Sequence, residues 1–312
     1  MNVVILDPAI NLTTTLTFEN AIDAHLRNSI TISEYLKCDI LIMEKDFNEA
    51  FEKKYDVIVL GYATRYAPFQ LINKLIDKNP KAKKIVISNE YNTNPSVGGF
   101  RPYELIANYE KSMSDKSEIK RHFLNLNLLF SKEPNEIKDK KYDCIYFGTF
   151  RVNRTEYFKK YLQDGIYLST SPRNFKKYKH IGCNPKYITK LTWKPQRETL
   201  NLFKYQLYIE DVETHSNFNN LANRYYEAGF CNNVVFFDVN CKNTINKSEL
   251  KDFKDEVEFY IVSSHKELQQ KIKECNKDFN KHLAIQKGWR ISEQARRDDM
   301  LKELKQIIYG QK

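Results

Sequence analysis

The chain has 312 residues, of which 50 are Lys or Arg and 40 are Asp or Glu, so its formal net charge is +10. This length accommodates one large domain or two ordinary ones. Hydrophobic residues make up 41% of the chain and aromatic residues 13%. Because that is enough apolar material for packed cores, the composition excludes a disordered or fibrous protein and predicts a soluble globular one.

The positive charge is carried mainly by lysine, with 38 Lys against 12 Arg. An excess of cations suits a polyanion such as nucleic acid, because binding releases the counterions condensed on it. An AT-rich genome, whose codons favour Lys and Asn, explains the same excess without any partner. The charge by itself therefore leaves nucleic-acid binding open.

The cysteines and the hydropathy profile bear on the compartment. The six cysteines form no CxxC pair and have no His at zinc-finger spacing, so we expect buried or incidental thiols in a reducing cytoplasm, that of the host cell if the protein is viral. The N-terminal run 1–7 lacks the charged lead-in of a signal peptide. No apolar window is long enough to span a membrane, so no membrane partner is expected.

In the first half of the chain, short apolar runs alternate with segments of helical periodicity. The expected strands are 3–6, 39–43, 57–60 and 84–88, and the expected helices are 24–36 and 69–78. This alternation is typical of βαβ units and a parallel, Rossmann-like sheet. Residues 111–142 are dense in charge, and we interpret them as a solvated helix face and an interdomain linker.

The second half repeats the alternation. The expected strands are 142–148, 165–169, 205–209, 234–237 and 258–262, and the expected helices lie near 151–162, 196–204, 218–229, 265–280 and 291–309. Gly310 suits the left-handed position after the last helix. We predict an α/β protein of two Rossmann-like domains, 1–140 and 141–290, with a ligand-binding interdomain cleft and a final helix, 291–312, that packs back on the first domain.

Several common catalytic motifs are missing from the sequence. The nine glycines form neither GxxxxGK[ST] nor GxGxxG, which removes P-loop and ordinary dinucleotide sites. HExxH, GxSxG and EF-hand patterns are also missing, and the six His are scattered. We therefore expect no protein-bound metal site of these kinds.

Residues 145–156 form the first informative segment. A strand ends at Gly148, a tight turn follows, and Arg151 and Arg154 come three residues apart at the start of the next helix, where we expect them on one face. A diphosphate placed there would gain the helix dipole, free backbone N–H groups and two guanidinium forks. The alternative interpretation is an exposed helix start that carries surface arginines.

The second segment is 220–238, in which Arg224 and Glu227 share a helical face and a buried strand follows. The arginine can hold a phosphate, and the carboxylate can accept both hydroxyl protons of a ribose. A simple salt bridge between residues three apart on a helix explains the same pair.

Together, in this order and spacing, the two segments resemble the nucleotide-sugar half of GT-B glycosyltransferases, and most closely the DNA β-glucosyltransferases of T-even phages. The turn from Gly148 to Arg151 is similar to the family's Gly-Ser-Phe-Arg turn, although Arg154 comes one residue sooner here. Arg224 and Glu227 match the family's Arg-x-x-Glu helix. The similarity extends from about 142 to the C-terminus and is faint through 1–110.

The resemblance implies a GT-B fold with a DNA-binding domain at 1–140 and a UDP-sugar-binding domain at 141–290. It implies that Arg151, Arg154 and Arg224 bind the diphosphate beside Gly148, and that Glu227 binds the ribose. Glu90 stands after the fourth strand, where the family has an Asp as general base; a surface Glu at a strand end is the alternative. Asp23 is the nearest match to the family's donor-sugar contact.

The activity implied is an inverting transfer of glucose from UDP-glucose to 5-hydroxymethylcytosine in double-stranded phage DNA, a modification that evades host defence. A monomer is expected, without a DxD metal motif but with Mg²⁺ as a possible assisting ion. Basic residues in 101–121 and 173–179 would contact DNA phosphates; for 173–179 a solvated loop is the alternative. Arabinose donors, uracil derivatives, a protein or polysaccharide acceptor, and a non-enzymatic DNA-binding protein remain open.

Overall fold

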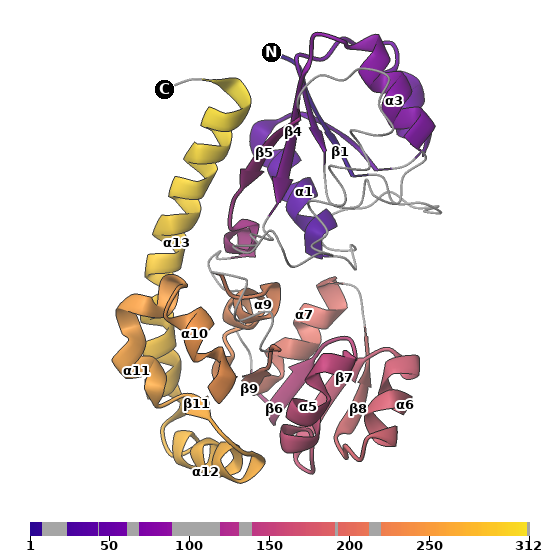
Figure 1. Ribbon diagram of the computed structural model, residues 1–312. Helices are drawn as coiled ribbons and strands as arrows, with labels where there is room; N and C mark the ends of the chain where they lie inside the picture. The colour runs from indigo at the N-terminus through magenta and orange to yellow at the C-terminus, as the bar shows by residue number, and fades with distance from the viewer. Residues whose placement is uncertain are drawn as a thin grey trace. The chain divides into compact units, whose positions relative to one another are not determined.

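The computed structural model describes residues 1–7, 24–42, 44–60, 69–88, 119–130, 139–190, 193–211 and 220–310. The candidates Asp23 and Glu90 lie outside these described residues. The chain divides into two compact units, unit 1 with residues 1–129 and 298–312, and unit 2 with residues 130–297 (Figure 1). The functional assignment of the two expected domains stays a prediction.

Unit 1 contains a five-stranded sheet with the order β2-β1-β3-β4-β5, in which every pair of neighbours is parallel. Its strands are β1 (Val3–Leu6), β2 (Asp39–Leu41), β3 (Val57–Leu60), β4 (Lys83–Ser88) and β5 (Lys120–Phe123). Its helices are α1 (Ala24–Leu36), α2 (Glu44–Ala50), α3 (Phe69–Lys78) and the 3₁₀ helix η2 (Leu126–Phe130). All four residues of β1 and of β3 are buried, as expected for strands covered on both faces.

The strand β5 corrects the interpretation of 111–142 as a linker. Its residues pair in parallel with β4, from Ile85 opposite Lys120 to Ser88 opposite Phe123. The sequence pattern fails here because Lys120, Arg121 and His122 are polar. Polar side chains are common on edge strands, where they discourage pairing with another chain, and β5 is the edge of this sheet.

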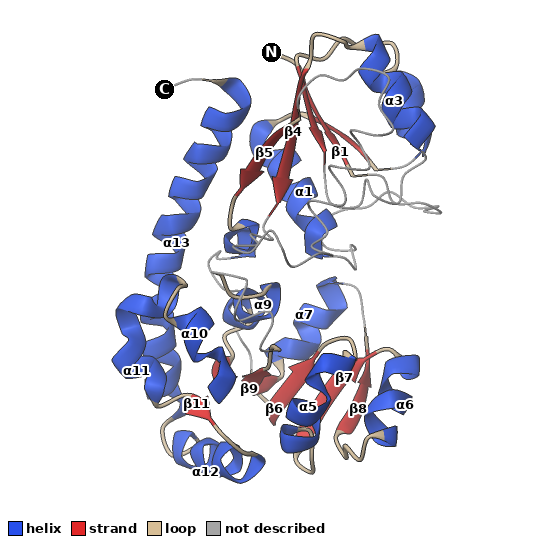
Figure 2. Ribbon diagram, viewed as in Figure 1, coloured by secondary structure: helices blue, strands red, loops and turns tan. Residues whose placement is uncertain are grey.

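Unit 2 contains a six-stranded parallel sheet with the order β11-β10-β9-β6-β7-β8 (Figure 2). Its strands are β6 (Tyr142–Phe147), β7 (Ile166–Thr170), β8 (Lys186–Thr189), β9 (Phe203–Tyr208), β10 (Val234–Asp238) and β11 (Ile261–Val262). The longer helices between them are α5 (Thr155–Tyr161), α6 (Pro172–His180), α7 (Trp193–Asn201), α9 (Asn223–Phe230) and α12 (His265–Cys275). After β10 come the short helices η4 (Val239–Cys241), α10 (Lys242–Ile245), η5 (Glu249–Phe253) and α11 (Lys254–Glu258). The predicted α/β class with two parallel sheets is confirmed.

Residues 173–179, for which a solvated loop was the alternative, lie in the helix α6. Ser171 caps it, since its hydroxyl accepts a hydrogen bond from the Asn174 N–H at 3.3 Å, and Pro172 occupies the first turn. The Ser-Pro pair is a helix-start signal that outweighs the charge density of the segment. The strand β8, which follows, was not predicted.

The last helix, α13, runs from Phe279 to Tyr309 and is longer than the predicted 291–309. Its first half packs in unit 2, where the side-chain amide of Gln286 pairs with both the N–H and the C=O of Val235. Its last turns, from Asp298 on, belong to unit 1, where the Tyr309 hydroxyl donates to the Leu36 carbonyl at 3.3 Å. Gly310 follows with φ of +66°, the predicted left-handed position.

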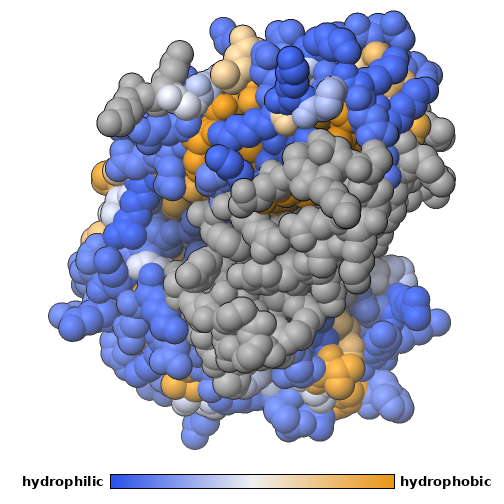
Figure 3. Space-filling view, turned by 45° about the horizontal axis from the view of Figure 1, so that its top comes forward, coloured by the Kyte–Doolittle hydropathy of each residue, from blue (hydrophilic) through white to orange (hydrophobic). Residues whose placement is uncertain are grey.

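The cysteines and the described surface agree with the expectations from composition. All six cysteines are free, and all except the half-buried Cys38 are buried, which confirms the expected thiols. On the face drawn in Figure 3 the described surface is mostly hydrophilic with scattered hydrophobic areas. Among the described residues, no helix is both long and apolar enough to cross a membrane.

Candidate functional site

The site begins where two neighbouring strands of unit 2 end. The strand β6 ends at Phe147 and leads into Gly148, while β9 ends at Tyr208 and leads into 209–211. The two strands pair directly, with Cys144 opposite Tyr205. Because carboxyl ends of parallel strands meet at one edge of a sheet, the residues after β6 and β9 lie together where ligands bind in open α/β sheets.

Arg154 ends the 3₁₀ helix η3 (Val152–Arg154) and points into this edge. Its Nε donates to Asp211 Oδ2 at 2.9 Å, and its Nη2 forms an ion pair with Glu210 Oε2. The Arg154 side chain is only 10% exposed. A guanidinium at this depth is stable only with such partners, since an unpaired buried charge is costly.

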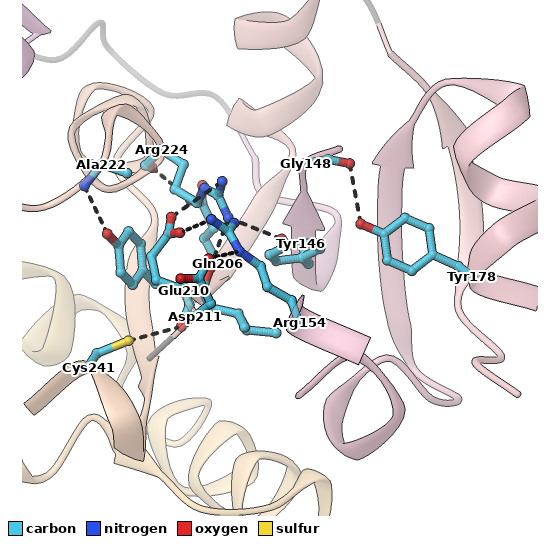
Figure 4. A network of polar contacts seen from close by, with 12 residues as sticks. Tyr146, Gly148, Arg154, Tyr178, Gln206, Glu210, Asp211, Ala222, Arg224 and Cys241 are labelled. Atoms are coloured by element: carbon cyan, nitrogen blue, oxygen red, sulfur yellow. Dashed lines mark hydrogen bonds and ion pairs between the residues drawn. The ribbon is translucent and has the colours of Figure 1, made fainter. Parts of the chain in front are cut away.

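Arg224, from the first turn of α9, approaches the same carboxylate from another direction (Figure 4). Its Nη2 lies 3.4 Å from Glu210 Oε1, and its Nη1 lies 3.0 Å from both the Tyr146 hydroxyl and the Ile209 carbonyl oxygen. The guanidinium also lies over the Tyr146 ring, 5.6 Å from its centroid. We call Arg154, Arg224, Glu210 and Asp211 the arginine cluster.

The electrostatics of the arginine cluster favour charged guanidinium groups. Burial is the largest single influence and lowers the pKa of Arg154 and of Arg224, but Glu210 together with the other acidic groups around them holds both pKa values above their ordinary value. Two cations and two anions give the cluster a formal charge of zero. Two guanidinium groups that share one carboxylate have the spacing and the charge to bind a diphosphate. Binding requires that the diphosphate displace the carboxylate.

Gly148 makes room for the tyrosine that supports Arg224. A Cβ atom at this position would lie 2.9 Å from the Tyr146 hydroxyl oxygen, closer than real contacts allow. The Tyr178 hydroxyl faces the Gly148 carbonyl at 3.5 Å, and burial raises the pKa of Tyr178 above its usual value. The glycine expected in the turn is thus required by packing around Tyr146.

Arg151 does not share a helix face with Arg154, contrary to the expectation from their spacing. It precedes η3 in extended conformation, with φ of −127° and ψ of 130°, and its side chain is exposed. An extended residue interrupts the helical period, so the two arginines diverge. Arg151 stays a predicted diphosphate contact that lies outside the arginine cluster.

Glu227 lies one turn after Arg224 on α9 and is 3% exposed. The contacts described above direct the Arg224 guanidinium toward Glu210 and Tyr146. Asp238, at the end of β10, is fully buried and accepts a hydrogen bond from the Tyr161 hydroxyl at 2.5 Å. The ribose-binding role of Glu227 stays a prediction.

The sequence analysis missed the carboxylates of the arginine cluster. Glu210 and Asp211 follow a strand whose last residues are buried, and both are themselves buried. Paired acidic residues directly after a buried parallel strand are a recognisable signal, because that position faces the ligand-binding edge. Within the described part of the chain, no group of three or more His, Cys, Asp or Glu side chains is arranged to hold a metal ion.

Comparison with known proteins gives matches in structure but not in sequence. No protein-family model matches the chain, and no curated protein sequence matches it significantly. The chain is similar to the phage T4 β-glucosyltransferase in complex with UDP-glucose, with a TM-score of 0.66, 15% identity and 99% of each chain covered. A structure of the same enzyme with UDP and Mn²⁺ gives a TM-score of 0.64 at 16% identity over 99% of each chain.

A third structure, an α-glucosyltransferase in complex with UDP and a 13-mer DNA containing an HMU base, gives a TM-score of 0.60 at 12% identity, again over 99% of each chain. At these identities the likeness concerns the fold. Since the two parallel sheets correspond along almost the whole length of glucosyltransferases of GT-B architecture, the predicted GT-B fold is confirmed.

Proposed function

We propose that the chain is a UDP-sugar-dependent DNA glycosyltransferase that moves glucose from UDP-glucose to 5-hydroxymethylcytosine in duplex DNA with inversion at the anomeric carbon. The observation that carries the proposal is the convergence of Arg154 and Arg224 on Glu210 at the carboxyl edge of the second sheet. The fold supports it, because structures of the same fold are named as glucosyltransferases bound to UDP, UDP-glucose or DNA.

The arginine cluster suits the departure of UDP. In the transfer, the acceptor oxygen forms a bond to the anomeric carbon, and the bond from that carbon to the UDP oxygen breaks. The electron pair leaves with UDP, so negative charge develops on the diphosphate. Guanidinium groups already held in place stabilise that charge without reorganisation at the moment of reaction, and each such donor typically contributes a few kcal/mol.

The remaining roles follow from the sequence. The acceptor hydroxyl must lose its proton as it attacks, and we assign that proton to Glu90, which comes two residues after β4 in the chain. Arg151 would add an exposed cation for the diphosphate, Glu227 would accept the ribose hydroxyls, and Asp23 would contact the sugar. A target base within a duplex is reached by extrusion from the stack or through the major groove.

The test is transfer itself. Duplex DNA containing 5-hydroxymethylcytosine is incubated with the protein and UDP-glucose, and the expected mass gain is one hexose per modified base. Matched DNA with ordinary cytosine is the control and should stay unchanged. Proton NMR of the released nucleoside reports the anomeric configuration, which we expect to be β. If a broad panel of UDP-sugars leaves the hydroxymethylated DNA unchanged, the proposal is wrong.

A further inference from the structure

The stretch 165–197 of unit 2 contains no acidic residue. It spans 33 residues and carries eight cations, whereas the chain as a whole has 40 acidic residues in 312, so a stretch of this length would on average hold about four. The eight cations are Arg173, Lys176, Lys177, Lys179, Lys186, Lys190, Lys194 and Arg197. The stretch includes β7, α6, β8 and the first half of α7.

The cations of α6 and β8 point to solvent. Along α6, the side chains at 173, 176, 177 and 180 follow helical spacing and are exposed. Lys186, the first residue of β8, and Lys190, directly after it, are also exposed, but they lie on the other side of the sheet from α6, because Tyr187 packs on Phe175 of α6 and side chains alternate along a strand. Among the described residues, none of these cations forms an ion pair with a carboxylate. We call Arg173, Lys176, Lys177 and His180 of α6 the basic face.

An aromatic pair between α6 and β8 lies beside the basic face. Phe175 of α6 and Tyr187 of β8 pack with ring centroids 4.5 Å apart, and Tyr187 is 39% exposed. Lys177 lies over the ring of Phe150, 5.8 Å from its centroid, so the basic face adjoins the turn that follows Gly148. The basic face therefore begins next to the residues that lead to the arginine cluster.

Structural roles explain only some of the cations of α6 and β8. Cations in the last turn of α6 stabilise the helix dipole, which accounts for Lys177 and His180. Lysines on β8 discourage pairing at the sheet edge. Neither role explains Arg173, which lies at the second helical position where the dipole disfavours a cation, nor the complete lack of acidic residues over 33 positions.

We infer that the basic face binds the phosphate backbone of duplex DNA next to the modified base. This rests on the proposed function for the identity of the acceptor. The basic face is about 10 Å long, at 1.5 Å per helical residue from Arg173 to His180. Because duplex DNA carries one charge per about 1.7 Å of axis, that surface matches several phosphates. Phosphate contacts fix register and orientation without reading sequence, which leaves recognition of the base to the other residues of the site.

The experiment compares two triple variants with the same loss of charge. The first is Arg173→Gln, Lys176→Gln and Lys177→Gln in the basic face. The second, the control, is Lys266→Gln, Lys273→Gln and Lys277→Gln, exposed lysines of and after α12 that are interspersed with Glu267 and Glu274. The affinity of each full-length variant for unmodified duplex DNA is measured by fluorescence anisotropy over a range of salt concentrations, and UDP affinity is measured in parallel.

We expect the basic-face variant to bind DNA at least about tenfold more weakly than the control, with a slope of log K against log salt flatter by about two to three, because each lost phosphate contact removes about 0.9 from the slope. Its UDP affinity should equal that of the wild type. Equal DNA binding by the two variants would overturn the inference, as would a wild-type protein that does not bind DNA. Basic-face-dependent DNA binding without sugar transfer would refute the proposed function and leave this inference standing.

Discussion

The arginine cluster and the basic face are both cationic features of unit 2, but they are built in opposite ways. In the arginine cluster, the side chains of Arg154 and Arg224 are only 10% and 16% exposed, and their charges are matched by Glu210 and Asp211. In the basic face, the cations are exposed along α6, within a stretch of 33 residues that contains no acidic residue. The total charge of +10 does not distinguish these two uses of positive charge.

The difference indicates what each region is suited to bind. Charges held rigidly in a buried site are little screened and require a partner of defined geometry, such as a diphosphate. Exposed charges on flexible side chains are screened within about 8 Å at physiological salt and suit an extended polyanion. Substitutions in the arginine cluster should therefore affect the nucleotide, and substitutions in the basic face should affect DNA.

The largest effect is expected for Arg224→Ala. The change removes a guanidinium that would stabilise the departing UDP, and we expect the rate of sugar transfer to fall by about 10²- to 10³-fold. Steady-state kinetics with hydroxymethylated DNA measure this. Arg296→Ala, which removes an exposed arginine that pairs with Asp252 at 3.1 Å, is the control and should keep its rate. A rate for Arg224→Ala within a factor of two of the wild type would contradict the assignment.

The next effect concerns the stability of the cluster without nucleotide. Glu210→Gln leaves two buried guanidinium groups with one carboxylate, and we expect the free energy of unfolding to fall by about 3–5 kcal/mol. Because a diphosphate would supply the missing negative charge, UDP should raise the melting temperature more in this variant than in the wild type.

The matched control for Glu210→Gln is Glu258→Gln, which breaks the exposed ion pair of Glu258 with Lys242 at 2.7 Å. We expect a loss of less than about 1 kcal/mol there. If the two substitutions cost the same, or if UDP stabilises Glu210→Gln no more than the wild type, then Glu210 does not occupy the place of a diphosphate.

A smaller effect is expected for Gly148→Ala. The added Cβ would displace the Tyr146 hydroxyl and with it a hydrogen bond of Arg224, so we expect a stability loss of about 1–3 kcal/mol and weaker UDP binding. Gly288→Ala is the control, since nothing lies within 4 Å of its new Cβ in α13 and the protein should gain about 0.5–1 kcal/mol. Thermal unfolding and UDP titration of both variants check these two expectations. An unchanged UDP affinity for Gly148→Ala would mean that Tyr146 does not contribute to UDP binding.

The last effect concerns a cation that belongs to neither region. The Lys140 ammonium donates to the carbonyls of Phe203 and Cys231, and burial lowers its pKa to about 7. Between pH 7 and the ordinary lysine pKa of about 10.4, the unfolded chain binds the proton and the folded protein does not, so stability rises with pH. Urea unfolding of wild type and Lys140→Met should show this rise in the wild type alone. Parallel pH profiles would mean that Lys140 keeps its proton.

Local motifs could be predicted from the sequence, and long-range contacts could not. The turn at Gly148 and the helix that bears Arg224 are contiguous patterns, and the structure places Arg154 and Arg224 together. Their shared carboxylate, Glu210, was missed because the contact joins three separate segments. Burial of Arg154 beside an exposed Arg151 was missed for a similar reason, since the extended conformation of Arg151 breaks the helical period on which the prediction relied.

In the fold, the buried runs of β1 and β3 were predicted, whereas β5, α6 and β8 were not. These three elements lie at or next to sheet edges, where one side meets solvent and polar residues replace the apolar pattern. The helix α2 and the short helices between β10 and β11 were also not predicted. Polar residues such as Lys120 and Lys186 make the elements at the sheet edges hard to predict. The same residues give the sheet edges their charge.

The most direct test is calorimetric titration of UDP into the full-length protein, its Arg154→Ala/Arg224→Ala variant and its basic-face triple variant. We expect the wild type and the basic-face variant to bind UDP at a single site with the same affinity, and the double arginine variant to lose at least about 10²-fold in affinity. Equal UDP affinity in the double arginine variant, or no UDP binding by the wild type, would contradict a nucleotide site at the arginine cluster.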